Sequence, residues 1–312
     1  MSGFNFTSSP PDSWDELCSA NGALFGTRRW QSLLRAGFGC DSAYASNGET
    51  GIVVSVFRGG PFRIGYVGFP AGGVIGQQLD SRSIVAALQS AASDTRIVCA
   101  RIPVRDAGAE LATTVSCVET PETVIDNLPD WHLGQGAGSL GRAVRKARRS
   151  DLQIRHVTVP ADGQQLFDLY AGTVRRHQGS MRYTRVYFEK LIDLSANDPQ
   201  LQVLAAVRDE AIGGFIVVAR HGDVAYYLHG GTHDEFRKDS PSDLLFDRAI
   251  HEARDAGCVS FNMMASPPDQ PSLVRYKEKW GGTTRTLKTC TAPLRPTYHL
   301  FRAAERIYSI FR

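Results

Sequence analysis

Two parts of this chain repeat one order of strands and helices, and the repeat limits the folds that the chain can adopt. In the second half, short apolar runs separated by polar turns predict an antiparallel meander at residues 201–207, 211–219 and 224–229. The first half has a shorter version, a hairpin at residues 51–57 and 62–69. The spacing to the next apolar strand agrees: Val98 lies 46 residues after Ile52, and Phe261 lies 46 residues after Phe215. A repeat of this length indicates a duplicated domain rather than a solenoid.

Further elements follow each hairpin. In the second half a helix begins at Ser240-Pro-Ser and ends at Gly257, and the later elements are a strand at 258–263, a helix at 271–280 and a strand at 284–291. In the first half a helix at 81–92 precedes a strand at 97–102. We therefore predict an α/β (α+β) protein with two tandem domains, residues 1–130 and 131–295, each a mixed, mainly antiparallel sheet flanked by helices. This order of elements is similar to the GNAT acetyltransferase fold.

Composition excludes several classes of protein. The formal net charge of +3 is too small to indicate nucleic-acid binding by itself, so the positions of the cations matter. Six cysteines, at positions 18, 40, 99, 117, 258 and 290, show no metal-ligand spacing, and we expect reduced thiols in a cytoplasmic protein. The histidines also lack ligand spacing, so no metal site is expected. Neither a secretion signal nor an apolar run of about 20 residues is visible.

A cluster of cations marks a predicted helix at residues 140–150. One face carries Arg142, Arg145, Lys146 and Arg149. The opposite face carries Leu140, Val144 and Ala147. One interpretation is the solvated face of an amphipathic helix. The other is a surface for the phosphates of tRNA, because four neighbouring cations repel each other unless an anion screens them.

A second group of cations follows the predicted helix at residues 164–176. It contains Arg175, Arg176, Arg182 and Arg185, together with Tyr183 and Tyr187. Arginine at a helix C-terminus is favoured by the helix dipole, which is a sufficient structural cause. A cationic, hydroxyl-rich loop also suits a phosphorylated substrate. Since the chain has no Walker loop and no nucleophile elbow, we expect an acceptor that brings its own nucleophile and an enzyme that positions it and stabilises charge.

Specific motifs then resemble the FemABX peptidyltransferases, double-GNAT proteins that pass an amino acid from aminoacyl-tRNA to an amine on a peptidoglycan precursor. The resemblance covers nearly the whole chain. It is carried by Phe25-Gly-Thr-Arg-Arg-Trp30, Thr173-x-x-Arg176, Tyr227-Leu-His-Gly-Gly-Thr232, Pro241-Ser-Asp-Leu-Leu245 and Arg275-Tyr-Lys-Glu-Lys-Trp-Gly-Gly282.

The resemblance implies roles for individual residues. Lys277 is the expected catalytic residue, which stabilises developing negative charge. The expected substrate-binding residues are Arg176, Tyr183, Tyr227, His229, Asn262 and Tyr276. Aminoacyl-tRNA is the expected co-substrate, and no cofactor is expected. The expected acceptor is an amine on a peptidoglycan precursor or on a small metabolite or peptide, and both phosphorylated and unphosphorylated acceptors stay open. The chain departs from the family at Asn262-Met-Met-Ala-Ser266, where relatives usually have Asp followed by two glycines.

Two other functions stay open. The first is an acyl-CoA-dependent N-acyltransferase that acts on a sugar or another amine. Such enzymes bind pyrophosphate with a glycine-rich loop before the helix that follows the meander, and residues 236–245 of this chain contain no glycine. The second is a non-catalytic binding module on the same double fold.

The last residues, 296–312, are predicted to form an amphipathic helix. Its apolar stripe consists of Leu300, Phe301, Ala304, Ile307, Tyr308 and Phe311. We expect this stripe to dock on the first domain. The alternative is a basic amphipathic helix that lies on a membrane surface.

Overall fold

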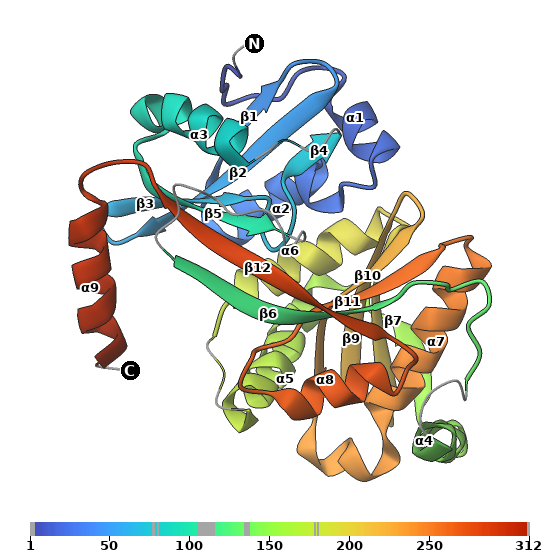
Figure 1. Cartoon of the computed structure of the whole chain (residues 1–312). Helices are drawn as coiled ribbons and strands as arrows, with labels where there is room; N and C mark the ends of the chain where they lie inside the picture. Colours follow the sequence, from blue (N-terminus) through green and yellow to red (C-terminus); the bar gives the residue numbers. More distant parts are fainter. Residues whose placement is uncertain are drawn as a thin grey trace. The chain divides into compact units, whose positions relative to one another are not determined.

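The computed structural model of the chain describes residues 4–76, 79, 81–104, 116–133, 138–177, 179 and 181–310. It divides into two compact units (Figure 1). Unit 1 consists of Met1–Glu119 and Thr286–Arg312, and unit 2 consists of Thr120–Arg285.

Unit 1 is a mainly antiparallel sheet in the order β1-β2-β3-β5-β12, and β4 pairs with β2. The strands are β1 (Asp41–Ser46), β2 (Thr50–Gly59), β3 (Phe62–Val67), β4 (Val74–Gly76), β5 (Ile97–Val104) and β12 (Thr283–Pro293). The helical elements are α1 (Trp14–Ala20), the 3₁₀ turn η1 (Leu24–Gly26), α2 (Arg28–Phe38), α3 (Ser81–Thr95) and α9 (Tyr298–Ile310). Successive residues of β2 face opposite sides of the sheet: Val54 packs with α3, and Val53 packs with Trp14 of α1.

Unit 2 is a sheet in the order β6-β11-β10-β9-β8-β7. Its strands are β6 (Ser116–Ile125), β7 (Gln153–His156), β8 (Leu201–Arg208), β9 (Ala211–His221), β10 (Val224–Thr232) and β11 (Ser260–Ala265). Its helical elements are α4 (Gly138–Arg148), η2 (Pro160–Asp162), α5 (Gly163–Arg176), α6 (Arg185–Ala196), η3 (Asp234–Asp239), α7 (Pro241–Asp255) and α8 (Pro271–Glu278). Ile216 of β9 joins a core with α4 and α7, whereas the adjacent Phe215 packs on Phe188 of α6. The helices therefore cover both faces of the sheet.

The predicted duplication is confirmed. In unit 1, β2 and β3 are antiparallel, α3 follows, and β5 pairs parallel to β3. In unit 2, β9, β10, α7 and β11 repeat this order and these directions. The closing strands are exchanged, because β12 of the second repeat pairs with β5, and β6 of the first repeat pairs with β11.

This exchange shifts the units away from the bounds predicted at 130/131 and 295/296. Unit 2 begins at Thr120 because β6 pairs within the sheet of unit 2. The chain returns to unit 1 at Thr286 because β12 pairs within the sheet of unit 1. The sequence pattern indicated where a strand lies at residues 284–291. The pattern could not indicate the partner, which is more than 180 residues away in β5.

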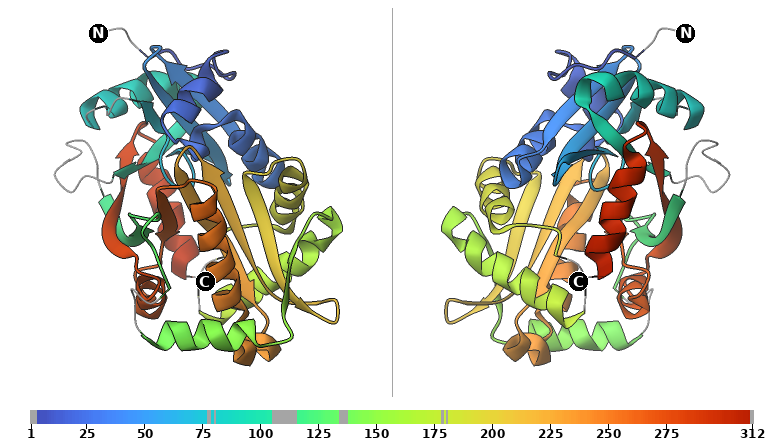
Figure 2. Two further views of the ribbon diagram at one scale, coloured as in Figure 1. Left: turned by 90° about the vertical axis from the view of Figure 1, so that its right-hand side faces the viewer. Right: turned by 90° about the vertical axis from the view of Figure 1, so that its left-hand side faces the viewer.

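The last helix, α9, packs within unit 1 and is seen lengthwise in Figure 2. Tyr298 and Phe301 form a small core with Val98 and Cys99 of β5. Leu300, which the periodicity placed on the apolar stripe, is exposed. The side chains of Ile307 and Tyr308, and all of Phe311, fall outside the described residues. Among the described residues, no helix has the length and apolar character needed to span a membrane.

The expectation of six reduced cysteines is wrong for one pair. Cys117 of β6 and Cys290 of β12 form a disulfide. Cys18, Cys40, Cys99 and Cys258 are buried thiols outside this disulfide, as expected. No local pattern indicates the bond, because 173 residues separate the two cysteines and only the fold brings their Cα atoms to 4.0 Å.

Candidate active site

The parallel strands β10 and β11 separate part-way along their length. Their paired residues end at Tyr226 and Asn262, and β10 then continues to Thr232 along β9. The carboxyl ends of parallel strands that separate are a common place for ligand binding in open α/β sheets. The predicted residues Tyr227, Asn262 and Lys277 lie near this point.

A bulge in β10 divides these residues between the two faces of the sheet. The register with β9 shifts between Tyr227 and His229. An extra residue in a strand reverses the alternation of the side chains beyond it. Tyr227 consequently packs on Phe246 of α7, with 4.7 Å between ring centroids, whereas His229 packs against Tyr187 of α6. Tyr227 and His229 therefore do not line one surface, contrary to the single binding set that the motif implied.

Lys277 lies inside unit 2, on α8. The helix begins with Pro271, and the chain turns at Gly281, where φ is 86°. Lys277 is only 2% exposed, and its Nζ donates a hydrogen bond to the carbonyl of Met264 at 2.9 Å. Burial lowers the pKa of Lys277 to about 7, and the Glu122 carboxylate opposes this effect. At neutral pH the amine therefore exchanges between its charged and neutral forms, as is typical of functional lysines.

An irregularity in β11 directs the Met264 carbonyl toward Lys277. Between Asn262 and Ala265, β11 has one residue more than the facing segment of β6, and Met264 has a φ of 61°. The side chain of Asn262 supports this turn, because its Oδ1 accepts from the Met264 N–H at 2.7 Å. Its Nδ2 donates to Oε1 of Glu122 at 3.2 Å, and both side chains are buried. Asn262 thus contacts β6 and β11 with its two polar groups.

Tyr276 connects α8 with the beginning of α7. Its hydroxyl donates to Oδ1 of Asp243 at 2.9 Å, and its ring packs on Phe246 and Trp280. Burial raises the pKa of Tyr276 and of Asp243. Burial also raises the pKa of Tyr227, the other predicted tyrosine on this face.

A second cluster lies on the face covered by α5 and α6. His229 Nε2 and the Tyr187 hydroxyl are 2.8 Å apart, and the ring centroid of Tyr183 lies 4.2 Å from that of His229. Burial lowers the pKa of His229 to about 3, so its imidazole is neutral at neutral pH. Burial raises the pKa of Tyr183 and of Tyr187. The cluster is aromatic and neutral.

The prediction of one cationic loop is wrong beyond Thr184. Arg185–Ala196 is helix α6, and Thr184 caps it by accepting from the Tyr187 N–H. Arg185 therefore pairs within its own helix, with Glu189 at 3.4 Å. The loop retains only the residues before the cap.

Arg176 ends α5 and is held by the chain itself. Its Nη2 lies 2.8 Å from Oδ1 of Asp234 and donates to the Thr232 carbonyl at 3.2 Å. The side chain keeps partial exposure. A phosphate at this position has to share the guanidinium with Asp234.

The basic face of α4 borders a surface pocket of about 450 Å³. The pocket is lined by Arg142, Arg145, Lys146, Arg149, Ser150 and Asp239. The opposite face of the helix buries Leu140, Val144 and Ala147. The structure thus brings the four predicted cations together around one hollow, with a single carboxylate, Asp239, in its lining.

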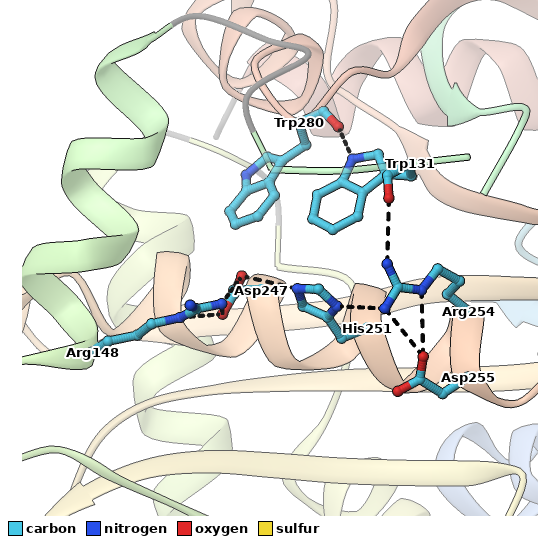
Figure 3. Close-up of polar contacts among 7 residues, drawn as sticks. All are labelled: Trp131, Arg148, Asp247, His251, Arg254, Asp255 and Trp280. Carbon is cyan, nitrogen blue, oxygen red and sulfur yellow. Dashed lines mark hydrogen bonds and ion pairs between the residues drawn. The ribbon is translucent and has the colours of Figure 1, made fainter. Parts of the chain in front are cut away.

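A polar network fixes α4 on α7 (Figure 3). Arg148 is not part of the pocket lining and binds the buried Asp247 through Nε and Nη2 at 2.7–2.9 Å. His251, one turn later on α7, lies 3.6 Å from Asp247. The bidentate contact orients the helix as well as holding it.

The same network reaches the end of α8. Arg254 of α7 lies 3.1 Å from His251 and donates to the carbonyl of Trp131 at 3.4 Å (Figure 3). The Trp131 Nε1–H donates to the carbonyl of Trp280 at 2.7 Å, and the two indole rings are stacked. Helix α7 therefore holds both α4, with the basic pocket, and the turn that follows Lys277.

Three carboxylates of this region were not predicted as site residues. Asp243 lies in the motif Pro241-Ser-Asp-Leu-Leu245, but it also stands in the first turn of a predicted helix, which is a common position for an acidic residue, and no role was predicted for it. Glu122 and Asp247 find their partners on β11 and α4, far away in sequence. Within the described residues, no group of three or more His, Cys, Asp or Glu side chains could hold a metal ion.

Residues 136–278 match the family described as Acetyltransferase (GNAT) domain. No curated protein matches the chain in sequence.

Solved structures share the fold along nearly the whole length of this chain. FemX is 13% identical, with 95% of this chain and 99% of that chain covered and a TM-score of 0.70. L-PGS from Bacillus licheniformis is 14% identical, with 95% and 96% covered and a TM-score of 0.63. A tandem GNAT protein from the clavulanic acid biosynthesis pathway is 12% identical, with 94% and 99% covered and a TM-score of 0.58. The predicted likeness to double-GNAT FemABX proteins is confirmed for the fold.

Proposed function

We propose that this acyltransferase forms an amide bond between an amino acid carried on tRNA and an amine acceptor. The observation that carries the proposal is the buried Lys277, whose amine lies beside β11 where it separates from β10. The acceptor amine attacks the ester carbonyl of the aminoacyl-tRNA, and the carbonyl oxygen becomes negative. A cation in a site that excludes water stabilises this oxygen far more strongly than it does in water.

The reaction balances without a cofactor. The new C–N bond forms as the C–O bond to the terminal ribose of the tRNA breaks, and the proton lost by the amine is taken up by the released ribose oxygen. The enzyme then has to position both substrates and stabilise charge. Tyr227, which was predicted to hold the acceptor, and Tyr276, which was predicted to contact substrate, both pack on Phe246 of α7.

Two features support tRNA rather than acyl-CoA as the donor. The basic pocket on α4 offers four cations to a phosphate backbone. The first turn of α7 is poorly suited to pyrophosphate, because Pro241 has no N–H and the N–H groups of Asp243 and Leu244 donate to the Ser240 carbonyl. The Asp243 carboxylate at this turn repels anions further. The fold shared with FemX and L-PGS is consistent with aminoacyl transfer.

Replacing Lys277 tests the proposal. Removing a cation beside an oxyanion costs about 3 kcal/mol, so we expect Lys277→Met to slow turnover about a hundredfold. The assay incubates the protein with charged tRNA and a mixture of amine acceptors, and mass spectrometry measures amide products. Lys279→Met, an exposed change on the same turn, is the matched control. Equal rates for the folded Lys277→Met variant and the control would remove the catalytic role.

An acyl-CoA-dependent N-acyltransferase is the second candidate, and the match to an acetyltransferase domain favours it. Calorimetric titrations of the protein with charged tRNA and, separately, with acetyl-CoA distinguish the two candidate functions. Saturable binding of acetyl-CoA and amide formation from it would replace the tRNA proposal. Binding of either donor without any product would leave a binding module on the GNAT fold.

A further inference from the structure

Lys277 is connected to a strand from the other half of the chain. Its Nζ donates to the Met264 carbonyl, the Met264 N–H donates to Asn262 Oδ1, and Asn262 Nδ2 donates to Glu122 Oε1. These three hydrogen bonds measure 2.9, 2.7 and 3.2 Å. They run from β6, which ends the first repeat, through the turn in β11 to α8. Every side chain on this path is buried, apart from the half-buried Met264.

Glu122 is also the charged neighbour of Lys277. The carboxylate favours the ammonium form of the lysine, against the effect of burial. The Met264 carbonyl of β11 accepts from the amine, and the Asp243 carboxylate of α7 accepts from Tyr276, the residue before Lys277. The other charged groups on this turn of α8, Glu278 and Lys279, are exposed.

We propose that Glu122 is a positioning residue for Lys277: through Asn262 it fixes the carbonyl that the lysine binds, and its carboxylate keeps positive charge on the lysine. Its effect on catalysis rests on the proposed function. Its effect on Lys277 itself does not, and can be measured in the free protein.

Glu122→Gln separates charge from hydrogen bonding. The glutamine carbonyl still accepts from Asn262, so a purely structural Glu122 predicts no change at Lys277. The loss of a carboxylate near a buried amine lowers the amine pKa by about one pH unit or more. Glu278→Gln removes a charge from the exposed side of the same helix and is the matched control.

The lysine can be followed directly by NMR. The chain has six lysines, Lys146, Lys190, Lys238, Lys277, Lys279 and Lys288, so ¹³C-lysine labelling gives a simple spectrum, and Lys277→Met assigns the signal. We expect Glu122→Gln to lower the Lys277 pKa by about one unit or more, Glu122→Asp to lower it less, and Glu278→Gln to leave it unchanged. An unchanged Lys277 pKa in folded Glu122→Gln overturns the proposal.

Two further readouts apply if Glu122→Gln does not fold. Asn262→Ala keeps the carboxylate but removes both side-chain hydrogen bonds, so we expect the Met264 amide to exchange with solvent at least about tenfold faster. Unchanged exchange overturns the positioning path. In the transfer assay, activity that needs the ammonium form falls above the Lys277 pKa, and Glu122→Asp moves this fall to lower pH. A shifted NMR pKa without such a fall in rate contradicts the proposed function and leaves the role of Glu122 intact.

Discussion

Because the amine of Lys277 is buried, we expect its removal to raise the free energy of unfolding at low pH. In the unfolded chain the lysine has its ordinary pKa of 10.5, and in the folded protein the value is about 7. Below about pH 7 both states are charged, and the folded state bears the full cost of burying the ammonium group. Between about pH 7 and pH 10.5 the unfolded state binds more protons, so stability rises with pH.

The size of the effect follows from the two pKa values. At about 1.4 kcal/mol per pH unit, their difference corresponds to roughly 5 kcal/mol at pH 6. Lys277→Met also leaves the Met264 carbonyl without its partner, which costs about 1–3 kcal/mol. We therefore expect Lys277→Met to be more stable than the wild type by about 2–4 kcal/mol at pH 6. By pH 9 the difference has narrowed by about 3 kcal/mol.

Urea denaturation followed by tryptophan fluorescence measures the free energy of unfolding of both proteins at pH 6 and pH 9. Trp280 lies three residues after Lys277 and reports on unit 2. Lys279→Met, on the exposed side of α8, is the control and should follow the wild type at each pH. A Lys277→Met protein that is less stable than the wild type at pH 6, or whose difference from it does not depend on pH, would refute the reasoning. The lysine would then be charged and well solvated in the folded state.

Three further predictions concern the surroundings of the site. The double variant Arg142→Glu/Arg145→Glu reverses two charges of the α4 pocket and should weaken tRNA binding and make it less dependent on salt. Filter binding at several salt concentrations measures both effects. An unchanged salt dependence would mean that this face of α4 only contacts solvent. Trp131→Ala should destabilise unit 2 by about 3–5 kcal/mol in urea titrations, because a buried ring and its hydrogen bond to the Trp280 carbonyl are both lost. A loss of stability below about 1 kcal/mol would mean that the network does not hold α8. Deleting residues 297–312 should lower the melting temperature in the absence of lipid, because Tyr298 and Phe301 are lost from the core on β5. A truncated protein with an unchanged melting temperature that no longer binds anionic vesicles would favour the membrane alternative.

Local sequence pattern was sufficient to predict the order of the elements along the chain. The repeat, the meander, the helix from Ser240-Pro-Ser to Gly257 and the amphipathic character of α4 depend on residues a few positions apart, and the structure has each of them. Helix α6 was also within reach of the same method. Thr184 is a good N-cap, and the buried residues Tyr187, Phe188, Leu191 and Ile192 recur at helical spacing. The two tyrosines and the arginines nearby led instead to the interpretation of a loop.

The sequence by itself determined that the chain has two GNAT-like repeats and that a lysine stands before a tryptophan and a glycine turn. Only the tertiary structure decided what surrounds that lysine. A one-residue bulge in β10 sends Tyr227 and His229 to opposite faces, and the exchange of β6 and β12 brings Glu122 to Lys277 and Cys117 to Cys290. Bulges and strand pairings arise from hydrogen bonds between distant segments, and the free energy of those bonds depends on partners that no local pattern contains.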